Sequence, residues 1–242
     1  MRSLIFLLLF SSQAFGAFVS QGTYQIGNGT NLIPKVPFYG LYDYSQSGMI
    51  YTASEIQEAT RSSTTDLGGL ISAMSLEFTA FATGFTVLNQ TIKISHVLED
   101  TIQGDYGSYY TYPDYRNLSL YDTTTVKENF TQVFSQNESW ETLNFVVGFT
   151  WNGQDNILIS WENRDGSWES GYGYVKGGGE NGKSHAWYSD NSYPIHSSTH
   201  DGRSPNIRLT FEAANPVPLP AGITLFLSGL VGLGFIRISN FK

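Results

Sequence analysis

One stretch of the chain, residues 145–163, constrains the fold more than any other. Its sequence is FVVGFTWNGQDNILISWEN, in which aromatic and β-branched residues alternate with small or polar residues. Alternation with a period of two predicts a β-strand that buries one face. Residues 152–156 contain Asn-Gly and Asp-Asn pairs, which tolerate left-handed backbone conformations and favour a chain reversal. The stretch therefore predicts a hairpin whose apolar face must be covered by a second sheet.

The predicted inward residues of this stretch occupy its odd positions: Phe145, Val147, Phe149, Trp151, Ile157, Ile159 and Trp161. Residues 70–80 and 91–98 alternate in the same way, and a last strand is predicted at residues 206–211 with Ile207, Leu209 and Phe211 inward. Shorter strands are predicted at residues 49–53, 118–121, 129–134 and 186–188, and a loop at residues 59–66. His96 follows the apolar register of its strand, which favours a hydrogen-bonded core or edge histidine over a catalytic base.

The composition agrees with an all-β domain. Aromatic residues make up 15% of the 242 residues, 25 residues are glycine, and only 14% are charged, which favours strands over helices. The chain has no cysteine and so forms no disulfide, which is ordinary for a bacterial envelope protein. The formal net charge of −8 argues against a nucleic-acid partner.

The N-terminal end carries a targeting pattern. Arg2 is followed by an apolar run at residues 4–10, and the small residues Ala14 and Gly16 occupy the positions that a signal peptidase requires. Residues 1–16 are therefore predicted to be a secretory signal peptide cleaved after Gly16. The apolar run is too short for a permanent span.

The C-terminal end carries a second pattern. Residues 17–212 are assigned to the β-sandwich domain, residues 213–220 to a proline-rich linker, and residues 221–242 to an apolar tail. Arg237 and Lys242 at the end of the tail favour a membrane helix whose last residues face the cytoplasm. The sequence leaves two fates open for this tail, which are proteolytic removal and permanent anchoring.

The most aromatic loop is at residues 104–115, GDYGSYYTYPDY. Within it, Tyr109, Tyr110 and Tyr112 are the candidate ligand-binding residues, because tyrosine rings can stack on sugar rings. The alternative is a structural role, in which the rings pack over a sheet edge and only the hydroxyls meet water.

One histidine pair resembles a metal site by spacing. His196 and His200 lie four residues apart beside Asp201. The prolines at positions 194 and 205 favour a loop here, and the glutamate of a metalloprotease helix is missing. The pair therefore predicts no metal site.

Two other loops have a partial likeness to functional motifs. Residues 163–167 are rich in oxygen ligands but lack the carboxylate spacing of an EF-hand, and residues 177–179 are three glycines without the strand and helix of a phosphate loop. Both are predicted to be turns. Because no nucleophile elbow or paired carboxylates are recognisable either, the sequence predicts no catalytic residue, cofactor or metal.

Several short motifs resemble a surface module of secreted multidomain proteins in the Bacteroidetes, where it occurs beside adhesin and sorting domains. The opening of that module is similar to PFYGLYDY at residues 37–44 and MIYTASEI at residues 49–56. Later landmarks follow in order: IKISH at 92–96, WETL at 140–143, NGQDNILI at 152–159, WYSD at 187–190 and SPNIRLTF at 204–211. The resemblance covers residues 24–211 and implies a jelly-roll-like β-sandwich at the cell surface, without an established catalytic set.

The tail resembles a different family. Val217, Pro218, Leu219, Pro220 and Ala221 precede the apolar run and are similar to the PEP-CTERM class of sorting signals in its VPLPA form. This resemblance implies that the inner membrane holds the precursor transiently until an exosortase-type protease cuts near the proline motif. The expected destination is the Gram-negative cell envelope, at its outer surface or in the extracellular matrix.

Together these patterns predict an exported, non-catalytic adhesive or binding module with a two-sheet, jelly-roll-like β-sandwich. The expected partners are the sorting protease and an exopolysaccharide or another surface glycan. A carbohydrate-binding module that uses loop tyrosines and tryptophans is the first alternative, and a hydrolase is the second.

Overall fold

The computed structural model describes residues 19–61, 68–79, 85–104, 111–114, 116–134, 139–168, 174–179, 182–193, 197–199 and 202–213. The predicted signal peptide, sorting motif and apolar tail lie outside these residues. Within the described part of the chain, no helix has the length and apolar character needed to cross a membrane.

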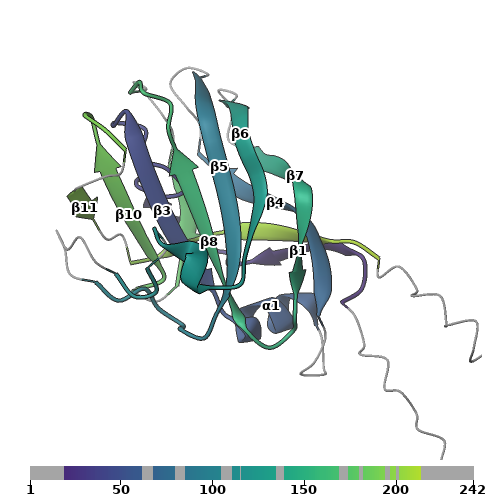
Figure 1. The fold of residues 1–242 in the computed structure, drawn as a ribbon. Coiled ribbons are helices and arrows are strands. Elements are labelled where there is room, and N and C mark those ends of the chain that lie inside the picture. Colours follow the sequence, from purple (N-terminus) through teal and green to yellow (C-terminus); the bar gives the residue numbers. More distant parts are fainter. Residues whose placement is uncertain are drawn as a thin grey trace, which may run out of the picture.

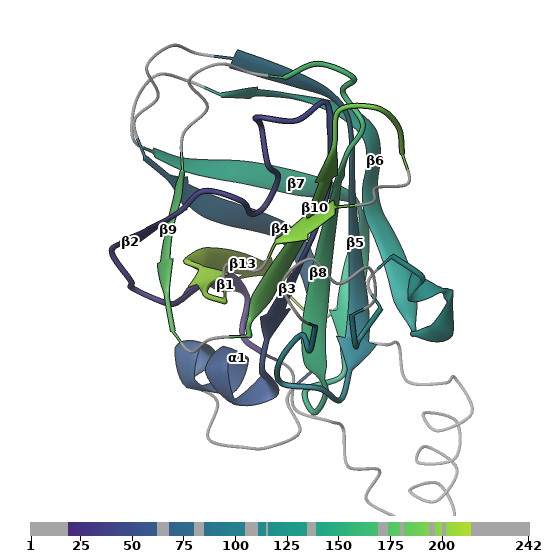
Figure 2. The same ribbon diagram turned by 90° about the vertical axis from the view of Figure 1, so that its left-hand side faces the viewer.

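The described chain forms two antiparallel sheets that pack face to face as a β-sandwich, as predicted (Figures 1 and 2). The first sheet contains β1 (Gly22–Ile26), β13 (Ile207–Phe211), β4 (Gly69–Phe78), β9 (Val175–Gly178) and β12 (Ser204–Pro205), with β2 (Asn31–Ile33) beside β9 and β7 (Ser139–Trp151) beside β4. The second has the order β11 (Ser197–Thr199), β10 (Ser184–Ser189), β3 (Tyr44–Tyr51), β8 (Asn156–Asn163), β5 (Phe85–Val97) and β6 (Thr123–Phe134). Figure 2 shows β7 and β4 running across the direction of β10, β3, β8 and β5.

The main core lies between the two sheets, and the alternation of the sequence builds it. In β13, Ile207, Leu209 and Phe211 are buried while the residues between them are partly exposed, as predicted. Met74, Leu76 and Phe78 of β4 and Ile92 and Ile94 of β5 are buried in the same core, as predicted. The period-two pattern therefore identified the inner face of these three strands correctly.

The hairpin predicted at residues 145–163 is wrong. The chain does reverse there, because Asn152 Oδ1 accepts hydrogen bonds from the N–H groups of Gln154 and Asp155, and Gly153 has a φ of 81°. However, β7 pairs with β4 in the first sheet, whereas β8 pairs with β3 and β5 in the second. Both edges of β8 are already occupied by these neighbours, so β7 faces β8 across the core instead of pairing with it.

Strand β7 also contains an irregularity that the sequence did not predict. Its register with β4 shifts between the pairs Ile71–Phe149 and Ala73–Asn144, which indicates a β-bulge. The bulge turns Val147, predicted to face inward, to the surface with an exposed fraction of 52%. The alternation of β7 is thus interrupted halfway along the strand.

Strand β8 is buried on both faces, although only its odd residues were predicted to be inward. Leu158, Ser160 and Glu162 lie on the outer face of the second sheet and are buried. The segment between β5 and β6 crosses this face and adds a second apolar cluster made of Ile50, Val97, Ile102, Leu118, Leu158 and Trp187. In Figure 1 this segment lies in front of β8.

One end of the sandwich is closed by a helix that was not predicted, and its last two residues fall in the loop expected at residues 59–66. Helix α1 (Ala53–Thr60) begins with a capping box, in which Thr52 Oγ1 accepts from the Glu55 N–H and Glu55 Oε2 accepts from the Thr52 N–H at 2.7 Å. Ile56 is fully buried and anchors the helix to the core. Figure 1 shows α1 below both sheets.

Two short segments also differ from the predictions. Gly177 and Gly178, predicted in a turn, lie in β9, where a Cβ on Gly177 would be 2.3 Å from the carbonyl oxygen of Ser204. Only glycine fits this close approach between strands. Residues 118–121, predicted as a strand, contain the 3₁₀ helix η1 (Leu118–Leu120).

Candidate functional site

The segment between β5 and β6 lies on the outer face of the second sheet and makes this face uneven. Hydrogen bonds tie this segment to the sheet: Asn156 Nδ2 donates to the Glu99 carbonyl at 2.8 Å, and the Ile102 N–H donates to the Gly182 carbonyl at 2.6 Å. Leu118 then enters the second apolar cluster. The segment is thus fixed on the sheet and forms one wall of a groove.

The groove encloses a cavity of about 370 Å³, and we call it the outer groove. One wall is Lys93 of β5 with Thr123 and Thr125 of β6, and the other is η1 with its flanking residues. The described lining consists of Lys93, Arg116, Asn117, Leu118, Ser119, Tyr121, Thr123 and Thr125. It is predominantly polar, with one aromatic ring.

The uncharged polar side chains of the outer groove are held by one another. Thr123 Oγ1 lies 2.7 Å from Ser95 Oγ and donates to the Leu118 carbonyl at 2.8 Å. Ser119 Oγ donates to Asn117 Oδ1 at 2.6 Å. Because Asn117 uses its oxygen as an acceptor, its amide nitrogen is the atom that can donate to a ligand.

Lys93 belongs to a charged network on the same face. Its Nζ is 2.5 Å from Glu162 Oε1, and Arg164 Nη2 is 2.8 Å from Glu162 Oε2. The Glu162 side chain is only 5% exposed, whereas the Lys93 side chain is 29% exposed. A ligand in the groove therefore meets the ammonium group before it meets the carboxylate.

Arg116 is fixed by an ion pair and by an aromatic ring. Its Nε lies 3.1 Å from Asp114 Oδ1, and its guanidinium carbon lies 4.3 Å from the centre of a Trp187 ring. Stacking of a guanidinium on tryptophan is favourable and restricts the orientation of the plane. Both cations of the outer groove are thus held in place.

Tyr112, the one predicted ligand-binding residue that is described, pairs with Gln103 and is not among the described residues that line the outer groove. Its side chain is 58% exposed. A hydrogen bond to Glu99 and the charge of that carboxylate raise the pKa of Tyr112. Partial burial raises the pKa of Tyr121, a backbone hydrogen bond from Asp114 lowers it, and the charges of Glu99, Tyr112 and Asp114 raise it further.

The other predicted site residues lie outside the described residues. These are Tyr109 and Tyr110 of the tyrosine loop, the sorting motif from Val217 to Ala221, and the pair His196 and His200. Only Tyr112 of the predicted ligand-binding set can therefore be placed.

Some residues that resemble functional motifs were predicted to have structural roles, and the structure describes them in part. The ring of His96 packs on Phe149 at 4.6 Å between centres, and its Nδ1 is 3.2 Å from Asp122 Oδ2, so the prediction of a hydrogen-bonded histidine is confirmed. Residues 163–167 form a turn in which Gly166 has a φ of 76°. Among the described residues, no group of three or more His, Asp or Glu side chains is arranged to hold a metal ion.

Comparison of the chain with protein-family models, with curated proteins and with solved structures finds no match.

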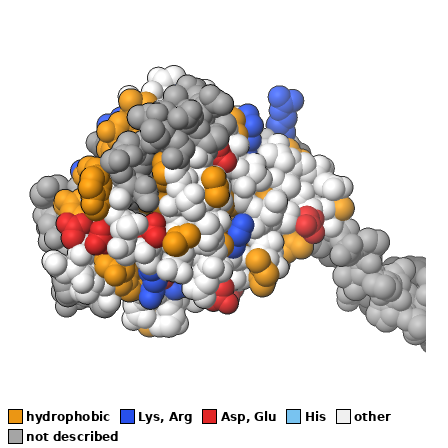
Figure 3. All heavy atoms as spheres, turned by 90° about the horizontal axis from the view of Figure 1, so that it is seen from above, with side chains coloured by type: hydrophobic (Ala, Val, Ile, Leu, Met, Phe, Trp, Pro, Cys, Tyr) orange, Lys and Arg blue, Asp and Glu red, His pale blue; other side chains and the backbone are white. Residues whose placement is uncertain are grey.

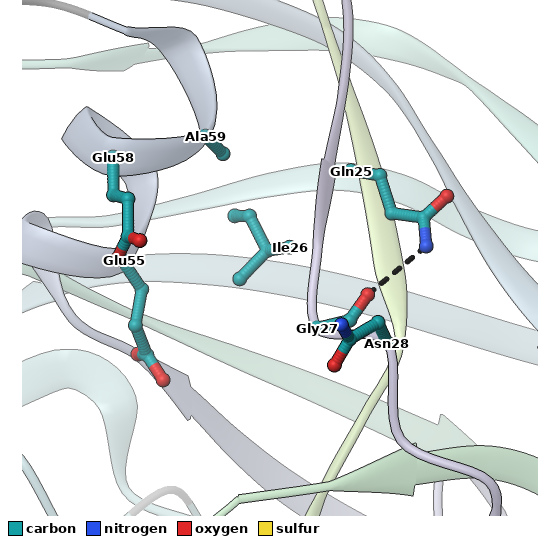
Figure 4. Close-up of a pocket in the computed structure, with 7 residues that line it drawn as sticks. All are labelled: Gln25, Ile26, Gly27, Asn28, Glu55, Glu58 and Ala59. Atoms are coloured by element: carbon teal, nitrogen blue, oxygen red, sulfur yellow. Dashed lines mark hydrogen bonds between the residues drawn. The ribbon is translucent and has the colours of Figure 1, made fainter.

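A second hollow lies at the end of the sandwich closed by α1, and we call it the helix groove (Figure 4). It encloses about 440 Å³ and is lined by Gln25, Ile26, Gly27, Asn28, Glu55, Glu58 and Ala59. Figure 4 shows the two glutamates on the helix facing Gly27 and Asn28, with Ile26 between them. Gln25 Nε2 donates to the Gly27 carbonyl at 3.0 Å, so its amide is already engaged.

The opposite end of the sandwich, viewed in Figure 3, carries several hydrophobic side chains. Tyr39, Tyr42 and Tyr188 pack together, with ring centres 4.2 to 5.1 Å apart. The ring of Tyr39 meets that of Tyr188 edge to face at 89°. These rings pack against one another, so the cluster has a structural role and does not form a flat platform on which a ligand could stack.

Sequence analysis missed both grooves for different reasons. The helix groove had a local signal, because Thr52 and Glu55 have the spacing of a capping box, which would have predicted α1. The outer groove had none, because Lys93, Arg116 and Thr125 come together only when the segment after β5 folds back over the sheet.

Proposed function

We propose that this chain is an exported, non-catalytic binding module, with a jelly-roll-like β-sandwich, that holds a polysaccharide of the cell surface or the extracellular matrix. Of the functions that the sequence left open, carbohydrate binding is the one that the geometry supports best. The observation that carries it is the outer groove, in which fixed hydroxyl, amide and cationic groups line a hollow together with the ring of Tyr121. The exposed Tyr112 shares the neighbour Glu99 with Tyr121.

The chemistry of this groove suits a sugar chain. A saccharide offers many hydroxyl groups that both donate and accept hydrogen bonds, together with apolar ring faces that pack on aromatic side chains. The polar lining can serve the hydroxyls, and Tyr121 and Tyr112 offer rings at its border. The described lining of the helix groove has two carboxylates and no aromatic ring, so it fits a sugar less well.

The proposal is tested by retention of the full chain in native gels that contain soluble polysaccharides. Tyr112→Ala should weaken retention about fivefold or more, because truncation of an aromatic anchor removes a large part of the contact. The midpoint of denaturation should not change, because the side chain is exposed.

Tyr174→Ala is the matched control, since Tyr174 is another exposed tyrosine and lies next to β9 of the first sheet. Retention that Tyr112→Ala leaves intact would remove the outer groove from consideration. If no polysaccharide in the panel retains the wild-type chain, the proposed function is wrong.

We also propose that the C-terminal tail is removed during export. Pro216, Pro218 and Pro220 have no backbone N–H donors, and this spacing of prolines predicts an extended, unpaired segment before the apolar run. An extended, unpaired backbone followed by the small residue Ala221 suits the cleft of a membrane-embedded exosortase-type protease. The apolar run would hold the segment at the inner membrane until cleavage.

The intact mass of the protein recovered from its native host tests this proposal. The mature chain should lack everything beyond about Ala221 and should begin near Ala17. A mass that still includes residues 223–242 would show instead that the tail is a permanent anchor.

A further inference from the structure

The charges of the outer groove differ from those of the whole chain. The chain has 21 acidic and 13 basic residues, so an average surface patch is negative. The described lining of the outer groove contains two cations, Lys93 and Arg116, and no carboxylate. This contrast indicates that the groove is adapted to a ligand with negative groups.

Glu162 orients Lys93 without cancelling the positive charge on that side of the groove, whereas Asp114 forms a one-to-one ion pair with Arg116. Glu162 carries one negative charge and is shared by Lys93 and Arg164, so this network of three has a net charge of +1. Glu162 is almost completely buried, and the Lys93 ammonium is the part that reaches the groove. An ammonium group has three donors, and Glu162 Oε1 engages one of them.

Arg116 adds a second positive group on the facing wall. Asp114 and the Trp187 ring fix the plane of its guanidinium. Nε and Nη2 donate to the two oxygens of Asp114 at 3.1 and 3.4 Å. A guanidinium carries a delocalised positive charge and five N–H donors in all, so it attracts a carboxylate more strongly than a hydroxyl group. The exposed hydroxyl of Thr125 and the amide of Asn117 are left to bind sugar hydroxyls.

From this arrangement we infer that the outer groove binds an acidic polysaccharide, a sugar chain that bears carboxylate groups of the uronic-acid kind. Its carboxylates pair with Lys93 and Arg116, and its rings lie against Tyr121 and Tyr112. The inference rests on the proposed polysaccharide-binding function and names the class of sugar that the same site selects.

The experiment compares two polymers that differ only in charge. Polygalacturonate and its fully methyl-esterified form have the same backbone, but only the first bears carboxylates. The full chain should bind the acid form at least about tenfold more tightly, as expected for a charge-assisted hydrogen bond. Salt dependence is a poorer measure, because salt also screens the repulsion between the acidic chain and the polymer.

Variants then locate the effect in the outer groove. Lys93→Met should remove most of the preference for the acid form, measured as the ratio of the two affinities, whereas Lys93→Arg should keep the preference. Arg208→Met is the matched control, because Arg208 also stacks on a tryptophan, Trp140, at 3.9 Å, but in the first sheet. It should behave as the wild type does.

The outcomes separate the inference from the function on which it rests. Equal binding of the two polymers by the wild type overturns the acidic preference while carbohydrate binding stands. A preference that survives in Lys93→Met overturns the assignment to this groove. If the wild type binds neither these polymers nor any other polysaccharide, both proposals fail. If Lys93→Met does not fold, the wild-type comparison and the Arg116→Lys variant test the inference instead. A lysine at position 116 keeps the positive charge but lacks the forked N–H donors of arginine.

Discussion

Replacement of Trp161 by alanine should lower the free energy of unfolding by about 3–5 kcal/mol, one of the two largest effects that we expect in this domain. Trp161 lies in β8, is completely buried, and packs with its ring centre 5.8 Å from that of Phe38. Its Nε1 also donates a hydrogen bond to Gln90 Oε1 at 2.7 Å. Urea denaturation followed by circular dichroism measures the change.

Two further variants divide this effect into its parts. Trp161→Phe retains most of the packing but leaves Gln90 Oε1 buried without this donor, which should cost about 1–3 kcal/mol. Trp168→Ala removes a tryptophan that is 61% exposed and should change stability by less than about 0.5 kcal/mol. A Trp161→Ala variant as stable as the wild type would place this ring outside the core.

Replacement of Trp187 by alanine should have a similar effect, about 3–5 kcal/mol, although this residue belongs to a different apolar cluster. Trp187 is fully buried on the outer face of the second sheet, below Arg116 and among the side chains that the segment after β5 brings to the sheet. The same loss should loosen this segment, and protease sensitivity near residues 98–104 should rise.

Leu120→Ala is the control for this prediction. Leu120 lies in the same segment but is 75% exposed, so its truncation should change stability by less than about 0.5 kcal/mol. If Trp187→Ala were equally neutral, the outer cluster would contribute nothing to folding, and the outer groove would lack a rigid floor.

The parts of the fold that could be predicted from the sequence are those in which local pattern and tertiary environment agree. Ile207, Leu209 and Phe211 alternate with partly exposed residues, and β13 has one buried face as the pattern requires. Leu158, in contrast, shares its face of β8 with the polar residues Asn156 and Ser160 and is nevertheless buried. The segment that covers Leu158 lies between β5 and β6. It is too far from β8 in the sequence for a local pattern around β8 to predict this burial.

The residues of the candidate site likewise divide into those that could be predicted from the sequence and those that could not. Tyr112 could be chosen from the sequence because a loop rich in tyrosine is unusual by composition alone, and the structure places it at the surface. Lys93 and Arg116 could not be chosen, because a single lysine in a strand and a single arginine in a loop are ordinary features. Their significance comes from the groove between them and from Glu162 and Asp114 behind them.

The short connection between β7 and β8 has a consequence for the order of folding. It joins two strands of different sheets, so that Phe149 and Trp151 enter the same core as Ile157 and Ile159, only a few residues later in the chain. Closing so short a loop costs little entropy, whereas most contacts in a β-sandwich join distant residues and form slowly. The two sheets can thus meet first at this corner. The more distant strands then add to a core that already contains residues from both sheets.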